Sequence, residues 1–192
     1  MAHTRLVLLA VMLVLVLAVS GCTGGSSPAA TGKPPATGPT GESQGAQSPN
    51  EPAQPVMTVV VYHATADAMY LVGEKHTISK NSHPAKTALE QLLQPPQGKD
   101  LVAVLPPDTK IRSLTVKDHV AYADFDDKLM KSNGGGSTTE RLIVGAIVNT
   151  LTEFSDIKKV QILVDGKTVE TLSGHMDVSH PLSRSEGIIK KP

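Results

Sequence analysis

Two histidines and a carboxylate lie within six residues near the C-terminal end of this chain, and such side chains bind metal ions. His175, Asp177 and His180 together form a ligand set that suits Zn²⁺. They follow the end of an expected strand and precede Pro181, a position typical of an exposed loop without fixed ligand geometry. We therefore interpret them as ordinary polar loop residues, and we predict no metal site and no cofactor.

A second candidate is the acidic group Asp124, Asp126 and Asp127, which could imitate a cation site. Alternation along a strand places Asp124 and Asp126 on one face and Asp127 on the other. We therefore favour solvated charges at a strand end. Asp124 is the member that we expect to be partly buried, accepting backbone N–H bonds near the helix that begins at residue 137.

The remaining candidates do not assemble into a catalytic pattern. The glycine-rich residues 132–136 precede a helix, whose N-terminus can bind an anion, but they lack the Gly-Lys-Ser/Thr ending of a nucleotide P-loop. His63, His76 and His83 lie far apart in the sequence, and the chain has no Gly-x-Ser-x-Gly elbow. No two acids stand out as the facing carboxylates of a cell-wall glycosidase. We predict no catalytic residue and no enzymatic activity.

Charge and aromatic content narrow the possible partners. Lys+Arg and Asp+Glu both number 18, whereas proteins that bind nucleic acid usually carry a basic excess. The chain has no Trp, two Phe and three Tyr, so few side chains can stack on bases or sugars. We therefore predict no nucleic-acid partner.

Cys22 is the only cysteine, and its surroundings indicate lipid attachment. Arg5 precedes 14 consecutive apolar residues, a run shorter than the roughly 20 residues of a spanning helix, which predicts a signal peptide over residues 1–21. Residues 19–22, Val-Ser-Gly-Cys, resemble the lipobox of bacterial lipoproteins. The resemblance implies cleavage after Gly21 and a diacylglyceryl thioether on Cys22, whose fatty acids, such as palmitate, anchor the chain to the extracytoplasmic face of the cell membrane. An ordinary signal peptide that happens to precede a cysteine is the alternative.

Residues 22–55 are expected to be the lipidated cysteine followed by a disordered linker. Residues 23–55 contain seven Pro and six Gly but no Val, Ile, Leu, Met or aromatic residue, so nothing offsets the entropy cost of ordering the backbone. A flexible coil of this length spans roughly 30 Å. The linker would therefore hold residues 56–192 near a membrane without pressing them onto it.

Residues 56–192 carry the apolar residues for one folded domain. Strands are expected at 56–63, 101–105, 110–117, 119–125, 159–164 and 167–172, with a short hairpin at 70–78 around Gly73-Glu74. Two-residue turns are expected at Asp118-His119 and Asp165-Gly166.

Two helices are expected between these strands. The first follows Pro84 and ends before Pro95, and the second runs from Ser137 to Phe154, opened by a capping box of Ser137 and Glu140. The order strand, helix, two strands, helix, two strands predicts an α+β fold in which two helices pack on one mixed or antiparallel sheet.

Several segments of this domain, taken together, resemble the GerMN domain family. They are ALEQLL, LVAVLPPDTKIRSLTVKDHVAYADF, GGGSTTE, IVNTLTEFSDIKKVQILVDGKTVETLSGH and MDVSHPLSR, which extend the resemblance from about Val56 to Ile188. The family pattern often has Ser at position 126 and Gly at position 119, where this chain has Asp and His. The resemblance implies a fold similar to the ring-building motifs of a sporulation channel and an assembly role outside the cytoplasm, without established enzymatic activity.

These observations predict a membrane-anchored extracytoplasmic lipoprotein whose GerMN-like domain binds or assembles with other proteins in sporulation, germination or cell-envelope complexes. Its expected partners are the membrane, through Cys22, and either envelope proteins or further copies of the chain. The alternative is an extracytoplasmic sensor or small-ligand-binding lipoprotein, which requires an apolar pocket with convergent polar groups.

Overall fold

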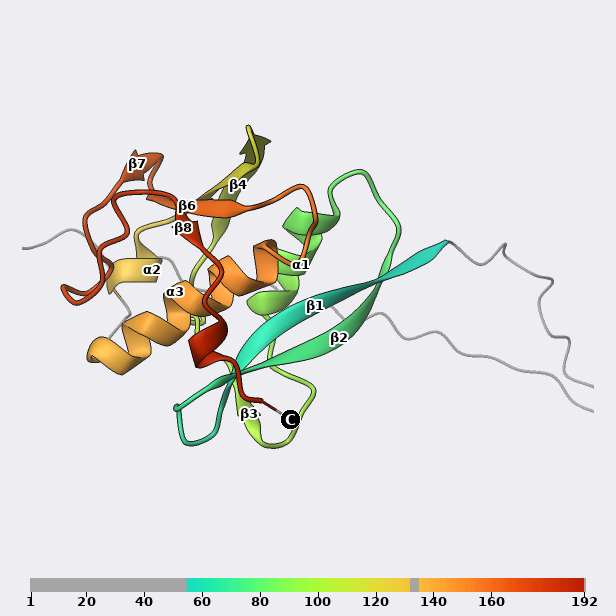
Figure 1. Ribbon diagram of the computed structural model, residues 1–192, viewed down its shortest axis with the longest axis horizontal. Coiled ribbons are helices and arrows are strands. Elements are labelled where there is room, and N and C mark those ends of the chain that lie inside the picture. The colour runs from blue at the N-terminus through green and yellow to red at the C-terminus, as the bar shows by residue number, and fades with distance from the viewer. Residues whose placement is uncertain (1–54, 132–134, 192) are drawn as a thin grey trace, which may run out of the picture. The chain divides into compact units, whose positions relative to one another are not determined.

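The computed structural model describes residues 55–131 and 135–191 (Figure 1). Its N-terminal part is a three-stranded antiparallel sheet in the order β2-β1-β3, formed by β1 (Val56–Thr65), β2 (Leu71–Ser79) and β3 (Leu101–Val102). Strand β1 is apolar and rich in β-branched residues, as expected of a central strand that is covered on both faces.

A second, mixed sheet is formed by strands from the C-terminal half. Its order is β4-β5-β6-β7, with β4 (Ile111–Lys117), β5 (Val120–Phe125), β6 (Lys159–Val164) and β7 (Lys167–Thr168), and β8 (Leu182–Ser183) also pairs with β6. The neighbours β5 and β6 are parallel, whereas the other pairs are antiparallel. The parallel pair requires a long crossover, which α3 provides.

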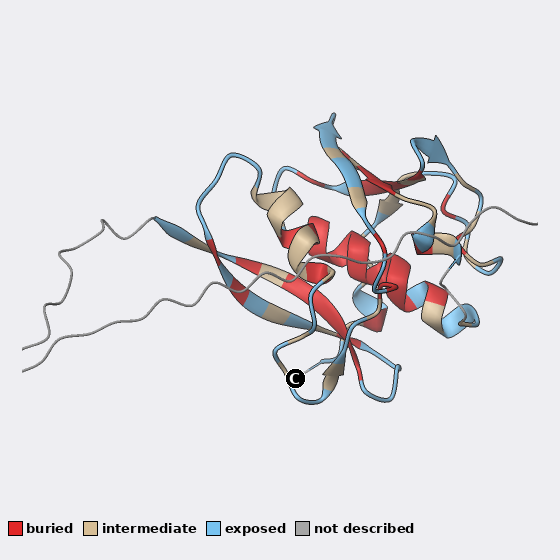
Figure 2. Ribbon diagram, turned by 180° about the vertical axis from the view of Figure 1, so that it is seen from behind, coloured by how far each residue is buried: buried red, intermediate tan, exposed pale blue. Residues whose placement is uncertain are grey.

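Helix α3 (Ser137–Leu151) is the central element of the domain. It packs against β1, β2, β6 and helix α1 (Pro84–Leu92). Glu140 and all residues from Leu142 to Leu151 are buried, and Figure 2 shows most of the helix in the colour of buried residues. The short helices α2 (Lys128–Lys131) and η1 (Glu186–Ile188) complete the described elements. Within residues 55–131 and 135–191, no helix is long and apolar enough to cross a membrane.

The α+β class and the mixed and antiparallel pairing are confirmed, but the strands divide between two sheets instead of forming one. The reason lies in α3, which is buried on all sides from Leu142 to Leu151. Such a helix must be covered on several sides, and a single sheet covers only one of them.

The two-residue turns are confirmed by their backbone angles. Asp118 and His119 both have positive φ, as a type I′ turn requires, and so do Asp165 and Gly166. The hairpin expected at residues 70–78 is wrong, because β2 runs through Gly73 as one strand and pairs with β1 along its length.

The capping box expected at the start of α3 is also wrong. The N-cap residue is Gly136, no side chain in the part of the chain that the structure describes caps the helix, and Ser137 already lies within it. Glu140 points elsewhere, as described below. Gly145 of α3 lies at a close packing contact, because a Cβ atom at this position would overlap Cδ1 of Ile188.

Candidate functional site

Cys22 and the predicted signal peptide and linker lie outside the described residues, as do residues 132–134 of the glycine-rich loop. The other side chains singled out from the sequence can be located.

His175, Asp177 and His180 do not converge on one point. Nδ1 of His180 lies 3.4 Å from the Asp177 carboxylate, whereas Nδ1 of His175 lies 3.2 Å from the carboxylate of Glu140. All three side chains are at least 43% exposed. Asp177 also accepts hydrogen bonds from the backbone and hydroxyl of Ser179, which lower the pKa of its carboxyl. This arrangement agrees with ordinary loop residues.

The three acids near the end of β5 are each engaged by a different partner. Asp126 accepts a hydrogen bond from the backbone N–H of Lys110 at 2.9 Å, and Asp127 forms an ion pair with Lys131, four residues later. Asp124 is buried and accepts a backbone N–H bond, as expected. Its donor is Gly166 in the turn after β6, at 2.7 Å, and not a residue near α3.

Glu140 is fully buried and binds the chain segment that follows β7. Its carboxylate accepts the backbone N–H groups of Leu172, Ser173 and His175 at 2.8, 2.9 and 2.8 Å. Burial disfavours the charged carboxylate, but the bonds from Ser173, Leu172 and His175 outweigh this effect and hold the pKa of Glu140 below its ordinary value. Glu140 is therefore a structural anion that fixes an irregular segment against α3.

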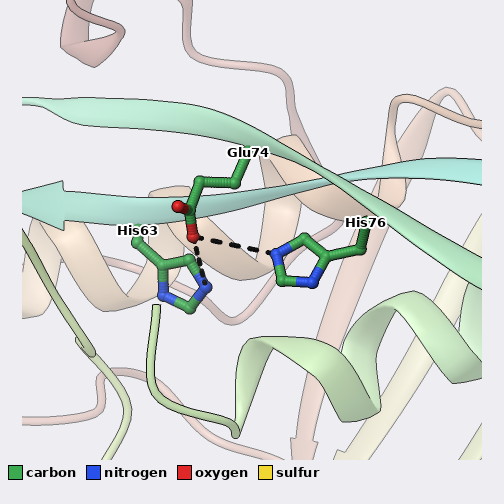
Figure 3. Close-up of side chains that lie close together, drawn as sticks. All are labelled: His63, Glu74 and His76. Carbon is green, nitrogen blue, oxygen red and sulfur yellow. Dashed lines mark ion pairs between the residues drawn. The ribbon is translucent and has the colours of Figure 1, made fainter. Parts of the chain in front are cut away.

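Three other side chains do converge, and Figure 3 shows them: His63 of β1 with Glu74 and His76 of β2. One carboxylate oxygen of Glu74 lies 3.7 Å from Nε2 of His63 and 3.7 Å from Nε2 of His76. We call these residues the His–Glu–His cluster. Imidazole and carboxylate donors at this spacing suit a divalent cation such as Zn²⁺.

The register of the first sheet brings the cluster together. Val61 pairs with Glu74 and His63 with Val72, so His63 and Glu74 are diagonal neighbours on one face. His76 follows Glu74 by two residues and projects from the same face. The loop after α1 closes over them, where the backbone N–H groups of Gln97 and Gly98 donate to the Glu74 carboxylate at 3.1 and 2.6 Å.

The histidines of the cluster lack hydrogen bonds that buried polar groups normally make. Both ring nitrogens of His63 and Nε2 of His76 have no hydrogen-bond partner among the described residues. Side-chain exposure is 0% for His63 and 5% for His76. Burial lowers the pKa of His63, although the nearby Glu74 carboxylate opposes this shift. The lowered pKa favours the neutral imidazole.

Sequence reasoning missed this cluster because it assigned Gly73-Glu74 to a turn, which would have directed Glu74 towards solvent. A signal was nevertheless present. Val72, Glu74, His76 and Ile78 alternate with Gly73, Lys75 and Thr77, and this alternation predicts a strand with two ionisable residues on its covered face.

Strand β4 forms an edge of the second sheet, and no described strand pairs with its outer side, which we call the open edge of β4. Lys117 and Val120 flank the two-residue turn and exchange both backbone hydrogen bonds, so the neighbouring pair Val116–Ala121 exchanges none. The N–H and C=O groups of Val116, and by the same alternation those of Leu114, therefore point away from β5. Figure 2 shows that most of β4 is exposed.

A groove of about 470 Å³ runs along this edge, between β4 and the start of α1. Its lining includes Leu114, Val116, Phe154 and Pro84, which offer apolar surface. Val116 is 43% exposed, so an apolar side chain from another molecule has direct access to it.

Comparison with known proteins gives consistent matches. Residues 60–170 match the Germane family, described as "Sporulation and spore germination". The chain is 33% identical over 125 residues to the spore germination protein GerM of Bacillus subtilis (strain 168), and the match covers 62% of this chain and 33% of that protein. The chain thus spans about a third of the length of this curated relative.

Two solved structures support the same relationship. The first GerMN domain of the sporulation protein GerM from Bacillus subtilis has a TM-score of 0.58 and 29% identity, covering 67% of this chain and 98% of that one. The tandem GerMN domains of the same protein have a TM-score of 0.59 and 28% identity, covering 67% of this chain and 46% of that one.

Proposed function

Since the chain belongs to the Germane family of sporulation and spore germination domains, we propose that it is a membrane-anchored extracytoplasmic lipoprotein whose domain binds partner proteins of a sporulation, germination or cell-envelope complex. The domain acts by binding and not by catalysis. The whole protein's role is part of this proposal, because the match covers a third of the curated relative.

The anchor is supported by the sequence of residues 1–22. A short basic start, 14 apolar residues and Val-Ser-Gly-Cys follow one another in the order that lipoprotein export and lipidation require. Two acyl chains on Cys22 would hold the protein stably, whereas one chain gives only marginal membrane binding.

Replacement of the anchoring thiol tests this part. We expect Cys22→Ser to move the protein from the membrane fraction to the soluble fraction while the far-UV circular dichroism spectrum of the domain is unchanged. Thr23→Ser, at the adjacent position, serves as the matched control and should stay with the membrane. Retention of Cys22→Ser in the membrane fraction would contradict lipid attachment.

The open edge of β4 is the observation that carries the binding function. Its outward N–H and C=O groups, which belong to Leu114 and Val116, can pair with an extended segment of another protein. The adjacent groove can then hold alternate side chains of the added strand. We propose that an envelope protein adds a strand here.

A proline at one position tests strand addition selectively. Val116→Pro removes an outward N–H group and leaves the ladder with β5 intact, because the N–H of Val116 does not bond to β5. Val116→Thr is the control, since it changes the side chain but keeps the backbone donor. In crosslinking of intact membranes, we expect adducts with wild type and Val116→Thr, and their loss with Val116→Pro. Equal adducts from both variants would refute docking at β4.

A further inference from the structure

The His–Glu–His cluster places two imidazoles in the protein interior with three of their four ring nitrogens unbonded among the described residues. A buried polar atom without a partner costs on the order of 1–3 kcal/mol. Valine or leucine would fill the covered face of β1 and β2 without this cost. The arrangement therefore indicates a ligand for these nitrogens.

Protons alone satisfy the cluster poorly. Two imidazolium ions beside one carboxylate would leave a net positive charge in a site where His63 is fully buried. The distance of 3.7 Å from either Nε2 to the Glu74 oxygen also exceeds a normal hydrogen bond. Neutral imidazoles beside a carboxylate instead present lone pairs on one side and a negative charge on the other.

We propose that His63, Glu74 and His76 bind one Zn²⁺ ion through the two Nε2 atoms and a carboxylate oxygen. Two histidines and one glutamate form an established zinc ligand set with one open position in tetrahedral coordination. Metal–ligand bonds of about 2.0–2.2 Å place ligand atoms roughly 3.3 Å apart. The two nitrogen–oxygen pairs at 3.7 Å need to close by only a few tenths of an ångström, and all three ligand atoms lie within 4.8 Å of one another. This site revises the sequence-based expectation that the chain holds no metal.

The surroundings of the cluster orient two of the three ligands. The backbone N–H groups of Gln97 and Gly98 fix the Glu74 carboxylate. The side-chain amide of Gln97 lies 3.1 Å from Nδ1 of His76, and a 180° rotation of this amide presents its oxygen as an acceptor. His76 would then donate from Nδ1 to Gln97 and keep the Nε2 lone pair for the metal, as metal-bound histidines commonly do.

His63 has no such second partner among the described residues. Because outer hydrogen bonds change metal affinity by roughly 10- to 100-fold, we expect weaker Zn²⁺ binding than at a site in which both histidines have such a partner. A surface groove of about 520 Å³ lies beside the cluster, and its lining includes Val72, the strand partner of His63, and Gly98. The bound ion would tie β1 to β2.

Titration of the metal-free chain tests the site. The full-length protein, purified in detergent and stripped with a chelator, is titrated with ZnCl₂ and, separately, with MgCl₂ in a calorimeter. We expect one Zn²⁺ per chain, a rise in melting temperature on binding, and no Mg²⁺ binding, because the site offers imidazole and too few oxygen ligands for Mg²⁺. His76→Gln and Glu74→Gln should each weaken Zn²⁺ binding at least tenfold.

The exposed histidines provide the matched control. The double variant His175→Gln/His180→Gln should bind Zn²⁺ as the wild type does, and loss of binding in this variant alone would overturn the proposal. Wild-type binding below half an ion per chain, or unchanged affinity in His76→Gln, would overturn it as well.

If the cluster variants unfold, Co²⁺ bound to the wild type decides the question. Intense visible absorption of a tetrahedral complex that Zn²⁺ displaces supports the site, and absence of such a band refutes it. The site lies on the first sheet and β4 on the second, so failure of Zn²⁺ binding leaves the strand-addition test unaffected.

Discussion

Glutamine at position 140 would keep the size and shape of the buried side chain while removing its charge. In the folded protein the Glu140 carboxylate accepts three backbone N–H bonds of 2.8–2.9 Å. Glutamine has one acceptor oxygen, which can keep the bonds from Leu172 and Ser173 in weaker, neutral form. Its NH₂ group would then face the N–H of His175, so that bond is lost and two donors meet.

The magnitude follows from these three bonds. Hydrogen bonds to a charged group contribute about 1.5–3 kcal/mol each and neutral ones about 0.5–1.5 kcal/mol, and the lower desolvation cost of glutamine offsets part of the loss. We expect Glu140→Gln to reduce the free energy of unfolding by about 2–3 kcal/mol at pH 7. For a domain of this size, that corresponds to a fall in melting temperature of roughly 10 °C.

The dependence on pH identifies the charge as the cause. The folded-state pKa of Glu140 lies below the ordinary value of 4.5, so its stabilisation is fully present above about pH 4.5 and is lost as pH falls through the folded-state pKa. The difference in stability between wild type and Glu140→Gln should therefore shrink as the pH falls below about 4.5.

Urea unfolding followed by far-UV circular dichroism measures this difference at each pH. Glu170→Gln, at an exposed position in the same part of the chain, is the control and should change stability by less than about 0.5 kcal/mol. A Glu140→Gln variant as stable as the control, or a difference that does not shrink at low pH, would refute the assignment of Glu140 as a buried, charged acceptor.

Two further predictions concern backbone positions. Gly145→Ala should destabilise the domain by about 1–2 kcal/mol in urea unfolding, because the cost of overlap with Ile188 exceeds the gain in helix propensity. Adding Ile188→Val should recover part of that loss. Additive effects of the two substitutions would contradict direct contact between the two residues. His119→Gly should change the free energy of unfolding by less than about 0.5 kcal/mol. Glycine adopts the positive φ at this position without strain, but the substitution also removes the 2.9 Å contact between His119 Nδ1 and the Asp156 carbonyl. Clear stabilisation would show that this contact contributes little.

Features with local signals were predicted from the sequence. The helix expected after Pro84 is α1. The Asp118-His119 and Asp165-Gly166 turns form because Asp and His adopt positive φ more often than most residues and glycine does so freely. The membership of the GerMN-type family is likewise confirmed, since its resemblance extends over many segments in order.

Features that depend on distant partners were not predicted. Glu140 sits three residues after Ser137, so a local capping box was the natural interpretation, yet its three donors lie 32–35 residues further along the chain. The His–Glu–His cluster depends on the register between β1 and β2, and a shift by one residue would move Glu74 to the opposite face. In both cases a local pattern, the capping box at Ser137 or the turn at Gly73-Glu74, was the stronger signal in the sequence.

The first residue of β1 is also the point at which the preceding chain joins the folded domain. Starting with Val56, the strand forms nine consecutive residue pairs with β2, and their hydrogen bonds run perpendicular to the strand. A pulling force applied at Val56 along the strand axis would load this ladder in shear, so that many bonds bear the tension together. The domain should therefore resist mechanical unfolding when force is applied at Val56.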